Sequence, residues 1–169
     1  MHNELNRIGK KPKYKQIDCE SMPMIEQSEI WYRYFRDRDN SIITDLFEGQ
    51  LMSKIECQKC SHKSLTFDNF MDLSIQIPKS SSSVPDCLEN FIAAEKMEKC
   101  GYKCSKCKAI DRMDKSITIF RFPKILVIHL KRFSRREKIA SSIGIPQKLD
   151  MTPYAPHSSK SPSFNLFNV

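Results

Sequence analysis

The sequence predicts an α+β fold that is rich in antiparallel strands, carries a zinc ribbon and has only a few short helices. Three observations support this prediction. Apolar and polar residues alternate from Leu65 to Ile77, the period of a strand with one buried face. Two Cys-x-x-Cys turns, at 57–60 and 104–107, can bring four thiolates to one ion. Apolar residues at helical spacing are confined to short stretches such as 26–38.

Composition sets the outer bounds of this interpretation. At 169 residues the chain is one domain or a piece of a larger one. No apolar run is long enough to span a bilayer, and the first residues lack the apolar core of a signal peptide. The chain has 7 cysteines, an odd number, and no export signal. We therefore expect an intracellular protein, in the cytoplasm, the nucleus or both.

The two cysteine turns are the most specific feature of the sequence. Each turn lets two thiolates point at one ion, so Cys57, Cys60, Cys104 and Cys107 can complete a tetrahedral zinc site. Such a site is structural, because four protein ligands leave no position open for chemistry. The long gap 61–103 predicts a substructure between the two turns, whose two ends are held together by the metal.

The sequence leaves other interpretations of these thiols open. Cys100 could replace Cys104 as a ligand at a looser spacing. The cysteines could also form disulfides, or stay buried without ever binding a metal. A reducing compartment favours the metal over the disulfides.

The elements before the first cysteine turn follow from periodicity and capping. Residues 26–38 predict a helix in which Trp31 is expected to anchor one face in the core. Ser41 is expected to cap a second short helix over 42–47. A strand is then expected to run into the first cysteine turn.

The alternating stretch predicts one long strand over 65–77, which starts beside the zinc turn and ends in a larger sheet. Its more polar face carries one aromatic side chain, Phe70, among carboxylates. Two interpretations of Phe70 stay open. It is either an exposed contact for a partner or a core residue packed under the helix that contains Phe91.

The last third of the chain contains the most apolar run of the sequence, 125–130. Because this run is apolar on both faces, it predicts a central strand. His129 lies within it and is expected to be a buried histidine with a hydrogen-bond partner, since no nucleophile is evident beside it. Residues 164–167 predict the start of another strand.

The net charge of +8 would suit nucleic acid or an acidic surface. The basic residues are scattered, however, with local clusters only at 7–15 and 131–138. Neither cluster interleaves aromatic residues as a base-stacking surface does. A solvated basic face is therefore expected, and nucleic acid is not the expected partner.

Several motifs, in this order, resemble those of the ubiquitin-specific protease family, which are papain-like cysteine deubiquitinases built from fingers, a palm and a thumb. These motifs are DLFEGQL at 45–51, the two cysteine turns, and RFPKILVIHLKRF at 121–133. The resemblance covers nearly the whole chain. It implies hydrolysis of isopeptide bonds at the ubiquitin C-terminus, with ubiquitin or a ubiquitinated protein as partner. It also implies that the zinc ribbon is the tip of the fingers, which cradle ubiquitin.

The resemblance also divides the chain. Residues 1–50 are expected to form thumb-side helices and 51–120 the zinc-ribbon fingers. Residues 121–169 are expected to form a palm strand and loop that stop before the family's histidine motif. The implied fold is thus an incomplete papain-like catalytic domain.

The residues that family enzymes use for catalysis are not expected in this chain. The family places its nucleophile in an Asn-Thr-Cys segment, whereas Cys19 stands in Ile-Asp-Cys-Glu. The family's general base stands in a Gly-His-Tyr motif, which contains none of His2, His62, His129 and His157. Because thiolate–imidazole chemistry needs both partners, we expect no catalytic residue here and no activity of this chain alone.

Two classes of function therefore compete. The first is a deubiquitinase by family, present here as an incomplete chain. The second is a binding module, either a non-catalytic ubiquitin receptor or a zinc ribbon that binds nucleic acid through its basic surface. Exons encoding Asn-Thr-Cys and Gly-His-Tyr on either side of this segment would favour the enzyme.

Overall fold

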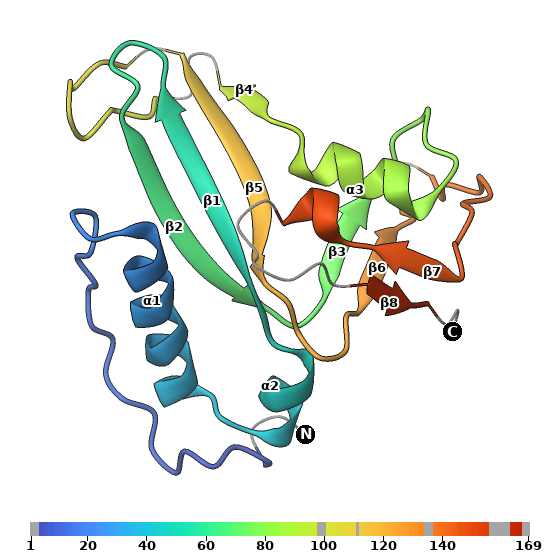
Figure 1. Cartoon of the computed structure of the whole chain (residues 1–169), viewed down its shortest axis with the longest axis horizontal. Helices are drawn as coiled ribbons and strands as arrows, with labels where there is room; N and C mark the ends of the chain where they lie inside the picture. The colour runs from blue at the N-terminus through green and yellow to red at the C-terminus, as the bar shows by residue number, and fades with distance from the viewer. Residues whose placement is uncertain (1–3, 98–100, 111, 134–136, 156–162, 167–169) are drawn as a thin grey trace.

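A long antiparallel sheet organises the molecule (Figure 1). The computed structural model describes residues 4–97, 101–110, 112–133, 137–155 and 163–166. The order of the strands in this sheet is β2-β1-β5-β4. Their bounds are Gly49–Cys57 for β1, Lys63–Phe70 for β2, Glu95–Met97 for β4 and Met113–Arg121 for β5. The predicted strand into the first cysteine turn is β1, and it lies in the middle of the sheet.

Two helices precede the sheet. Helix α1, Met24–Arg38, lies alongside β2, and α2, Ile42–Phe47, leads into β1 (Figure 1). The predicted cap of α2 is confirmed, because the Ser41 hydroxyl accepts from the Thr44 N–H while the Thr44 hydroxyl accepts from the Ser41 N–H. This reciprocal pair satisfies two N–H groups that the first turn of a helix leaves without backbone partners.

The contacts that α1 makes with the sheet differ from the prediction. The buried residues of α1 are polar, Gln27 and Ser28. The Ser28 hydroxyl donates to Gln50 Oε1 at 2.6 Å, and Gln50 Nε2 donates back to the Ser28 carbonyl at 3.2 Å. Trp31 is only half-buried, and its ring stacks on Phe35 of the same helix with ring centroids 5.9 Å apart. Helical spacing identified the aromatic stripe correctly, but the contact that fixes the helix is a buried polar pair.

The predicted long strand is two strands. Strand β2 ends at Phe70 and β3 covers Leu73–Gln76, with a bend between them. Apolar residues at odd positions are buried in both strands, Phe67 in β2 and Leu73 and Ile75 in β3, but β2 pairs with β1 whereas β3 pairs with β6, Ile128–Lys131, in another sheet. The expected connection between two parts of the fold is present. The bend also places Phe70 in the main core at 9% exposure, so the interpretation of Phe70 as an exposed contact is wrong.

The predicted central strand is shorter and more exposed than expected. Strand β6 pairs in parallel with β3, and this is its one strand neighbour among the residues that the structure describes. Ile125 and Val127 are 45% and 40% exposed. His129 is also exposed, with Nδ1 3.3 Å from the Ser74 hydroxyl, so the prediction of a buried histidine is wrong. The prediction assumed a neighbour on both sides of the strand.

The main core lies where β3 and β6 meet α3, Val84–Ile92 (Figure 1). A small hairpin of β7, Lys148–Asp150, and β8, Ser163–Asn165, confirms the strand predicted near the end of the sequence. The short 3₁₀ helix η1, Thr152–Tyr154, packs against α3. Within the described ranges, no helix is long and apolar enough to cross a membrane.

Candidate metal centre

Each cysteine turn lies at the far end of the long sheet from the main core (Figure 1). The first turn joins β1 to β2, and the second lies between β4 and β5. The two turns have the same backbone pattern. The Ser61 N–H donates to the Cys57 carbonyl at 2.8 Å, and the Lys108 N–H donates to the Cys104 carbonyl at 3.0 Å. Ser61 and Lys108 both have positive φ, at 54° and 59°, which closes each turn tightly.

A second pair of bonds repeats the same symmetry. The Cys57 N–H donates to the His62 carbonyl at 2.9 Å, and the Cys104 N–H donates to the Ala109 carbonyl at 3.0 Å. One side-chain contact then joins the two turns, because His62 Nε2 lies 2.9 Å from the Ser105 hydroxyl. The sequence analysis did not identify this contact, since nothing local in the sequence connects a residue of one turn to a residue of the other.

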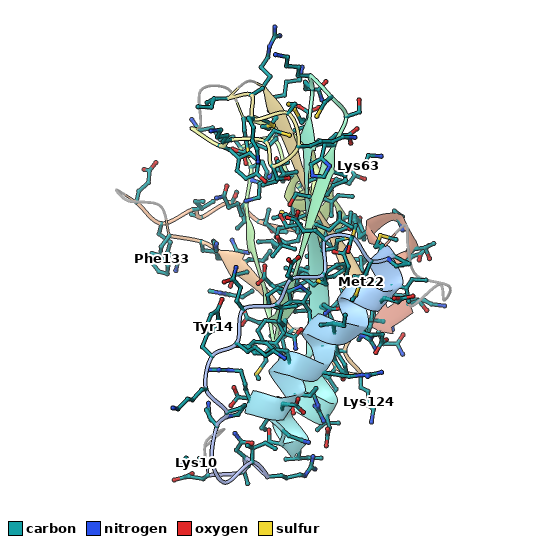
Figure 2. The ribbon with its side chains drawn as sticks, turned by 90° about the vertical axis from the view of Figure 1, so that its left-hand side faces the viewer. Lys10, Tyr14, Met22, Lys63, Lys124 and Phe133 are labelled. Carbon is teal, nitrogen blue, oxygen red and sulfur yellow. The ribbon has the colours of Figure 1, made fainter. Side chains whose placement is uncertain are left out.

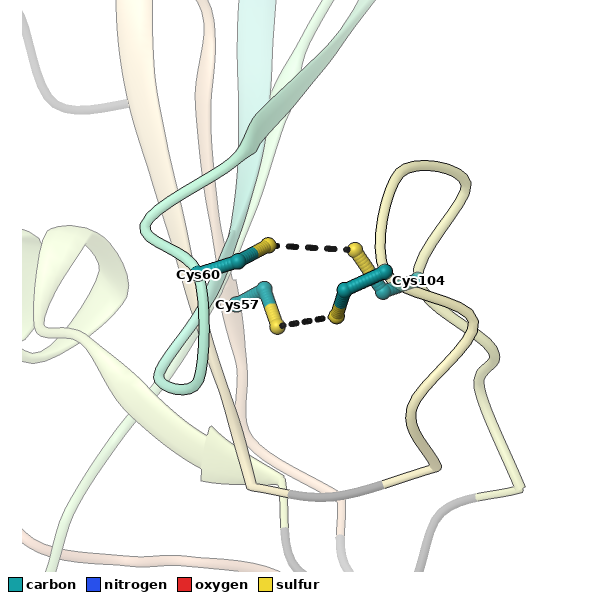
Figure 3. Close-up of side chains that lie close together, drawn as sticks. Cys57, Cys60 and Cys104 are labelled. Carbon is teal, nitrogen blue, oxygen red and sulfur yellow. Dashed lines mark hydrogen bonds between the residues drawn. The ribbon is translucent and has the colours of Figure 1, made fainter.

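The four predicted sulfur ligands converge at this end of the sheet (Figure 3). The sulfurs of Cys57, Cys60, Cys104 and Cys107 all lie within 4.8 Å of one another. The Cys57 and Cys107 sulfurs are 3.7 Å apart, as are those of Cys60 and Cys104. These distances are far longer than the ~2.05 Å of a disulfide bond, so the cysteines are free thiols.

The spacing of the sulfurs fits a tetrahedral ion. A tetrahedron with Zn–S bonds of about 2.3 Å has an edge of about 3.8 Å, close to the two measured separations. Four sulfur donors are also the set that zinc prefers in closed structural sites. Cys104 takes part in the cluster, and its predicted competitor Cys100 lies outside the described residues.

A small group of side chains surrounds the sulfurs. Met113 is fully buried against Cys57 and Cys104, and Tyr102, two residues before Cys104, packs on the same cluster. Gln58, in the first turn, hydrogen-bonds Asp114 of β5 and so connects the turn to the sheet. These contacts orient the two turns before any ion binds.

The sulfurs differ in their affinity for protons. Backbone N–H groups of Cys107, and then Lys106, lower the pKa of Cys104 to about 6 against the opposing effect of burial. For Cys60, the backbone hydrogen bond from His62 lowers the pKa, but burial and the neighbouring cysteine sulfurs raise it to about 11 overall. Metals bind thiolates rather than thiols, so binding of an ion to the cluster displaces the protons of its thiols.

The other described thiols are buried, and the described imidazoles contact hydroxyl groups. Cys19 is 6% exposed, and burial raises the pKa of its thiol. Cys87 is fully buried in the main core. The two described histidines, His62 and His129, each contact a serine hydroxyl.

Comparisons with known proteins agree with these features. The family model for ubiquitin carboxyl-terminal hydrolases matches residues 1–169. Ubiquitin carboxyl-terminal hydrolase 2 of Gallus gallus is 36% identical over 180 residues, which cover 100% of this chain and 50% of the relative. The Homo sapiens protein of the same name is 34% identical over 180 residues, covering 100% of this chain and 29% of the relative.

A solved structure is similar to this chain in its fold. A chain of the SAGA DUB module bound to monoubiquitin superposes with a TM-score of 0.65 at 29% sequence identity. The match covers 75% of this chain and 33% of that chain. The chain thus spans half or less of the length of the relatives it matches.

Proposed function

The chain belongs to the ubiquitin carboxyl-terminal hydrolase family, and we propose that it forms the ubiquitin-binding fingers and part of the palm of a cysteine-type deubiquitinase. The family match over residues 1–169 is the observation on which this proposal rests. The four-cysteine cluster at the end of a long sheet supports it, as the zinc-ribbon fingers implied by the sequence. The reaction of the whole enzyme is hydrolysis of the isopeptide bond at the C-terminus of ubiquitin.

This chain by itself is proposed to bind ubiquitin without cleaving it. Nucleophilic catalysis by a thiol needs a thiolate within hydrogen-bond reach of an imidazole. Burial opposes ionisation of Cys19, and the imidazoles of His62 and His129 contact serines instead of cysteines. Strand β6 has one strand neighbour among the described residues, and Ile125 and Val127, which precede it, are half exposed. Both observations support a palm that a further part of the enzyme completes.

The proposed lack of activity is tested with a fluorogenic ubiquitin amide and a ubiquitin-based cysteine-reactive probe. A longer relative such as the chicken enzyme serves as the positive control. We expect neither cleavage nor labelling of this chain. Labelling that disappears in Cys19→Ser or Cys87→Ser would place a nucleophile within this chain and overturn this part of the proposal.

The ion at the cysteine cluster is proposed to be zinc in a structural role. When bound, zinc supplies a constraint on folding, since Cys57, Cys60, Cys104 and Cys107 fill its coordination sphere. Four reduced thiols also suit the expected intracellular location. Elemental analysis of purified protein should give one zinc per chain, and a sub-stoichiometric content that zinc addition cannot raise would contradict the assignment.

The ubiquitin-binding face is proposed to include the exposed polar side of β2 and the bend after it. Thr66, Asp68 and Asp72 remain exposed there, although Phe70 between them turns into the core. Two exposed carboxylates favour a partner with basic groups. The solved relative bound to monoubiquitin supports ubiquitin as that partner.

Charge reversal tests this face. Asp68→Lys with Asp72→Lys should weaken ubiquitin binding by roughly three- to tenfold in an NMR titration, because rim charges act mainly on association. Glu26→Lys with Asp37→Lys, at two exposed carboxylates of α1, makes the same change in net charge and should leave binding unchanged. A titration that shifts no ubiquitin resonances, with the zinc in place, would remove the binding claim and leave the family assignment standing.

A further inference from the structure

The metal-binding end of the finger sheet, which we call the finger tip and define by its described residues 54–63, 95–97, 101–110 and 112–115, holds much of the chain's positive charge. These segments contain nine basic and three acidic residues, a net charge of +6 within a chain of +8. Four thiolates around one zinc ion would contribute a net charge of about −2, so the tip stays positive with the metal bound.

The two cysteine turns display the basic side chains in equivalent positions. Lys59 and Lys106 are each the third residue of a Cys-x-x-Cys turn, and the turns share the same backbone hydrogen bonds. Lys63 and Lys103 flank these turns. All four lysines are exposed, and Figure 2 shows Lys63 on the flank of the tip.

These lysines are also free of ion pairs. Within the described part of the chain, none of Lys59, Lys63, Lys103 and Lys106 pairs with a carboxylate. Among the described residues of the tip, Lys54 pairs with Glu56 at 3.3 Å, and Asp114 hydrogen-bonds Gln58. No described carboxylate therefore neutralises these four lysines.

The remaining side chains of the tip indicate which kind of anion would bind. Ile110, three residues after the second turn, is 65% exposed. Tyr102, the described aromatic residue of the tip, is half-buried on the sulfur cluster. Single-stranded nucleic acids are held by aromatic side chains that stack on the bases, which this surface lacks among its described residues. Exposed lysines beside an aliphatic side chain suit an acidic polypeptide better.

We propose that the finger tip is a docking surface for an acidic protein segment, in which glutamates or aspartates contact the lysines and an aliphatic residue packs on Ile110. The inference does not depend on catalysis or on ubiquitin binding. Lysine is depleted in stable protein interfaces, and exposed charges are screened by salt. The complex is therefore weak and rapidly exchanging, and it depends strongly on ionic strength.

The test uses the full chain with its metal and a short fluorescein-labelled peptide of glutamates with leucine at every fourth position. Fluorescence anisotropy measures its binding at low salt and at about 0.15 M salt, where the Debye length is about 8 Å. A peptide with glutamine in place of glutamate controls for charge. We expect binding of the acidic peptide alone, weakened by salt.

Matched charge reversals locate the surface. Lys59→Glu with Lys106→Glu should weaken binding by about tenfold or more, since four units of charge change at the tip. Lys10→Glu with Lys124→Glu makes the same change in net charge at exposed lysines of the opposite end (Figure 2) and should leave binding within about twofold. Ile110→Ser should weaken binding by about threefold, as expected for loss of one half-buried aliphatic contact. Zinc content and circular dichroism verify that each variant is folded.

Each other outcome overturns the proposal. Equal losses in the two double variants would mean that the overall charge of the chain attracts the peptide. Tighter, tip-dependent binding of a single-stranded DNA of equal charge would make the surface a nucleic-acid site. Absence of peptide binding at low salt, with zinc bound, would mean that the lysines only solubilise the tip.

Discussion

The two ends of the long sheet are stabilised by different means. At the end opposite the finger tip, thirteen buried residues of the described part form one apolar core between β3, α3 and the last third of the chain. At the finger tip, the buried group among the described residues is Cys57, Cys104 and Met113. Apolar burial contributes about 25 cal/mol per Å², so the main core can be stable by packing alone whereas the tip cannot. The tip must take its stability from ligation and from the hydrogen bonds of its turns.

The largest expected effect is loss of the metal. Cys104→Ser should unfold the turns and the adjoining ends of β1 and β5 while the main core stays folded. The reason is that ligation energy, on the order of 10–16 kcal/mol in zinc-finger peptides, is local folding energy. Amide hydrogen exchange should show the loss of protection at the tip alone. Cys19→Ser, at a buried thiol outside the cluster, should leave the metal bound. Equal loss of protection in β3 would show that the two ends fold as one unit.

The next largest effect is expected in the main core. Phe70→Ala should lower the free energy of unfolding by roughly 3–5 kcal/mol, because it leaves a cavity in the main core. Phe133→Ala is the matched control: Phe133 is 76% exposed and its loss should cost no more than about 0.5 kcal/mol. Urea denaturation measures both. A small effect of Phe70→Ala, together with weaker ubiquitin binding, would restore the interpretation of this residue as a surface contact.

The same contrast explains which features the sequence could predict. The sulfur cluster was predictable because each Cys-x-x-Cys spacing is a local signal and two of them suffice for one ion. The cap at Ser41 was predictable for the same reason. The bend after Phe70 was not, since apolar residues recur at odd positions on both sides of it and only Asn69 and Phe70 depart from the alternation. Alternation does not report which strand the residues pair with.

Strand β6 shows a second limit of prediction from sequence. An apolar run on both faces predicts two covered faces, but coverage depends on elements far away in sequence. In the described residues β6 has one strand partner, so His129 is exposed against the prediction of burial. The buried hydrogen bond between Ser28 of α1 and Gln50 could not be predicted, because a pair of buried polar residues leaves no periodic signal in the sequence.

A smaller effect is expected where β1 begins, at the end of the sheet opposite the finger tip. Gly49 lies against the Phe70 ring, and a Cβ at this position would come within 2.8 Å of the Arg121 carbonyl. Gly49→Ala should therefore destabilise the protein by about 1–3 kcal/mol through overpacking. Gly9→Ala is the control, since a Cβ there meets nothing within 4 Å. Thermal unfolding distinguishes the two, and equal melting temperatures would mean that the Phe70 ring moves aside at no cost.

The smallest effects concern two carboxylates beside the start of β1 that share one arginine. Arg36 contacts Asp45 at 2.5 Å and Glu48 at 3.3 Å. Hydrogen bonds from Arg36, and then from Arg7, lower the pKa of Asp45 from its usual 3.8. Burial raises the pKa of Glu48 from its usual 4.5, although Asn69 and Arg36 oppose the change. One carboxylate is thus held in its charged form and the other is favoured in its neutral form.

These opposite shifts predict opposite dependences of stability on pH. The contribution of Asp45 is present above its usual pKa of 3.8 and is lost as the pH falls through the lowered value, so Asp45→Asn should flatten the decline of stability in acid. The folded chain binds the proton of Glu48 more tightly than the unfolded chain does. Its contribution is therefore full below 4.5 and is lost as the pH rises through the raised value, a loss that Glu48→Gln should abolish. Urea denaturation of both variants across the acid range measures the slopes. If both variants change the slope of unfolding free energy against pH in the same direction, the pKa of both carboxylates is shifted the same way by Arg36. Burial would then not raise the pKa of Glu48.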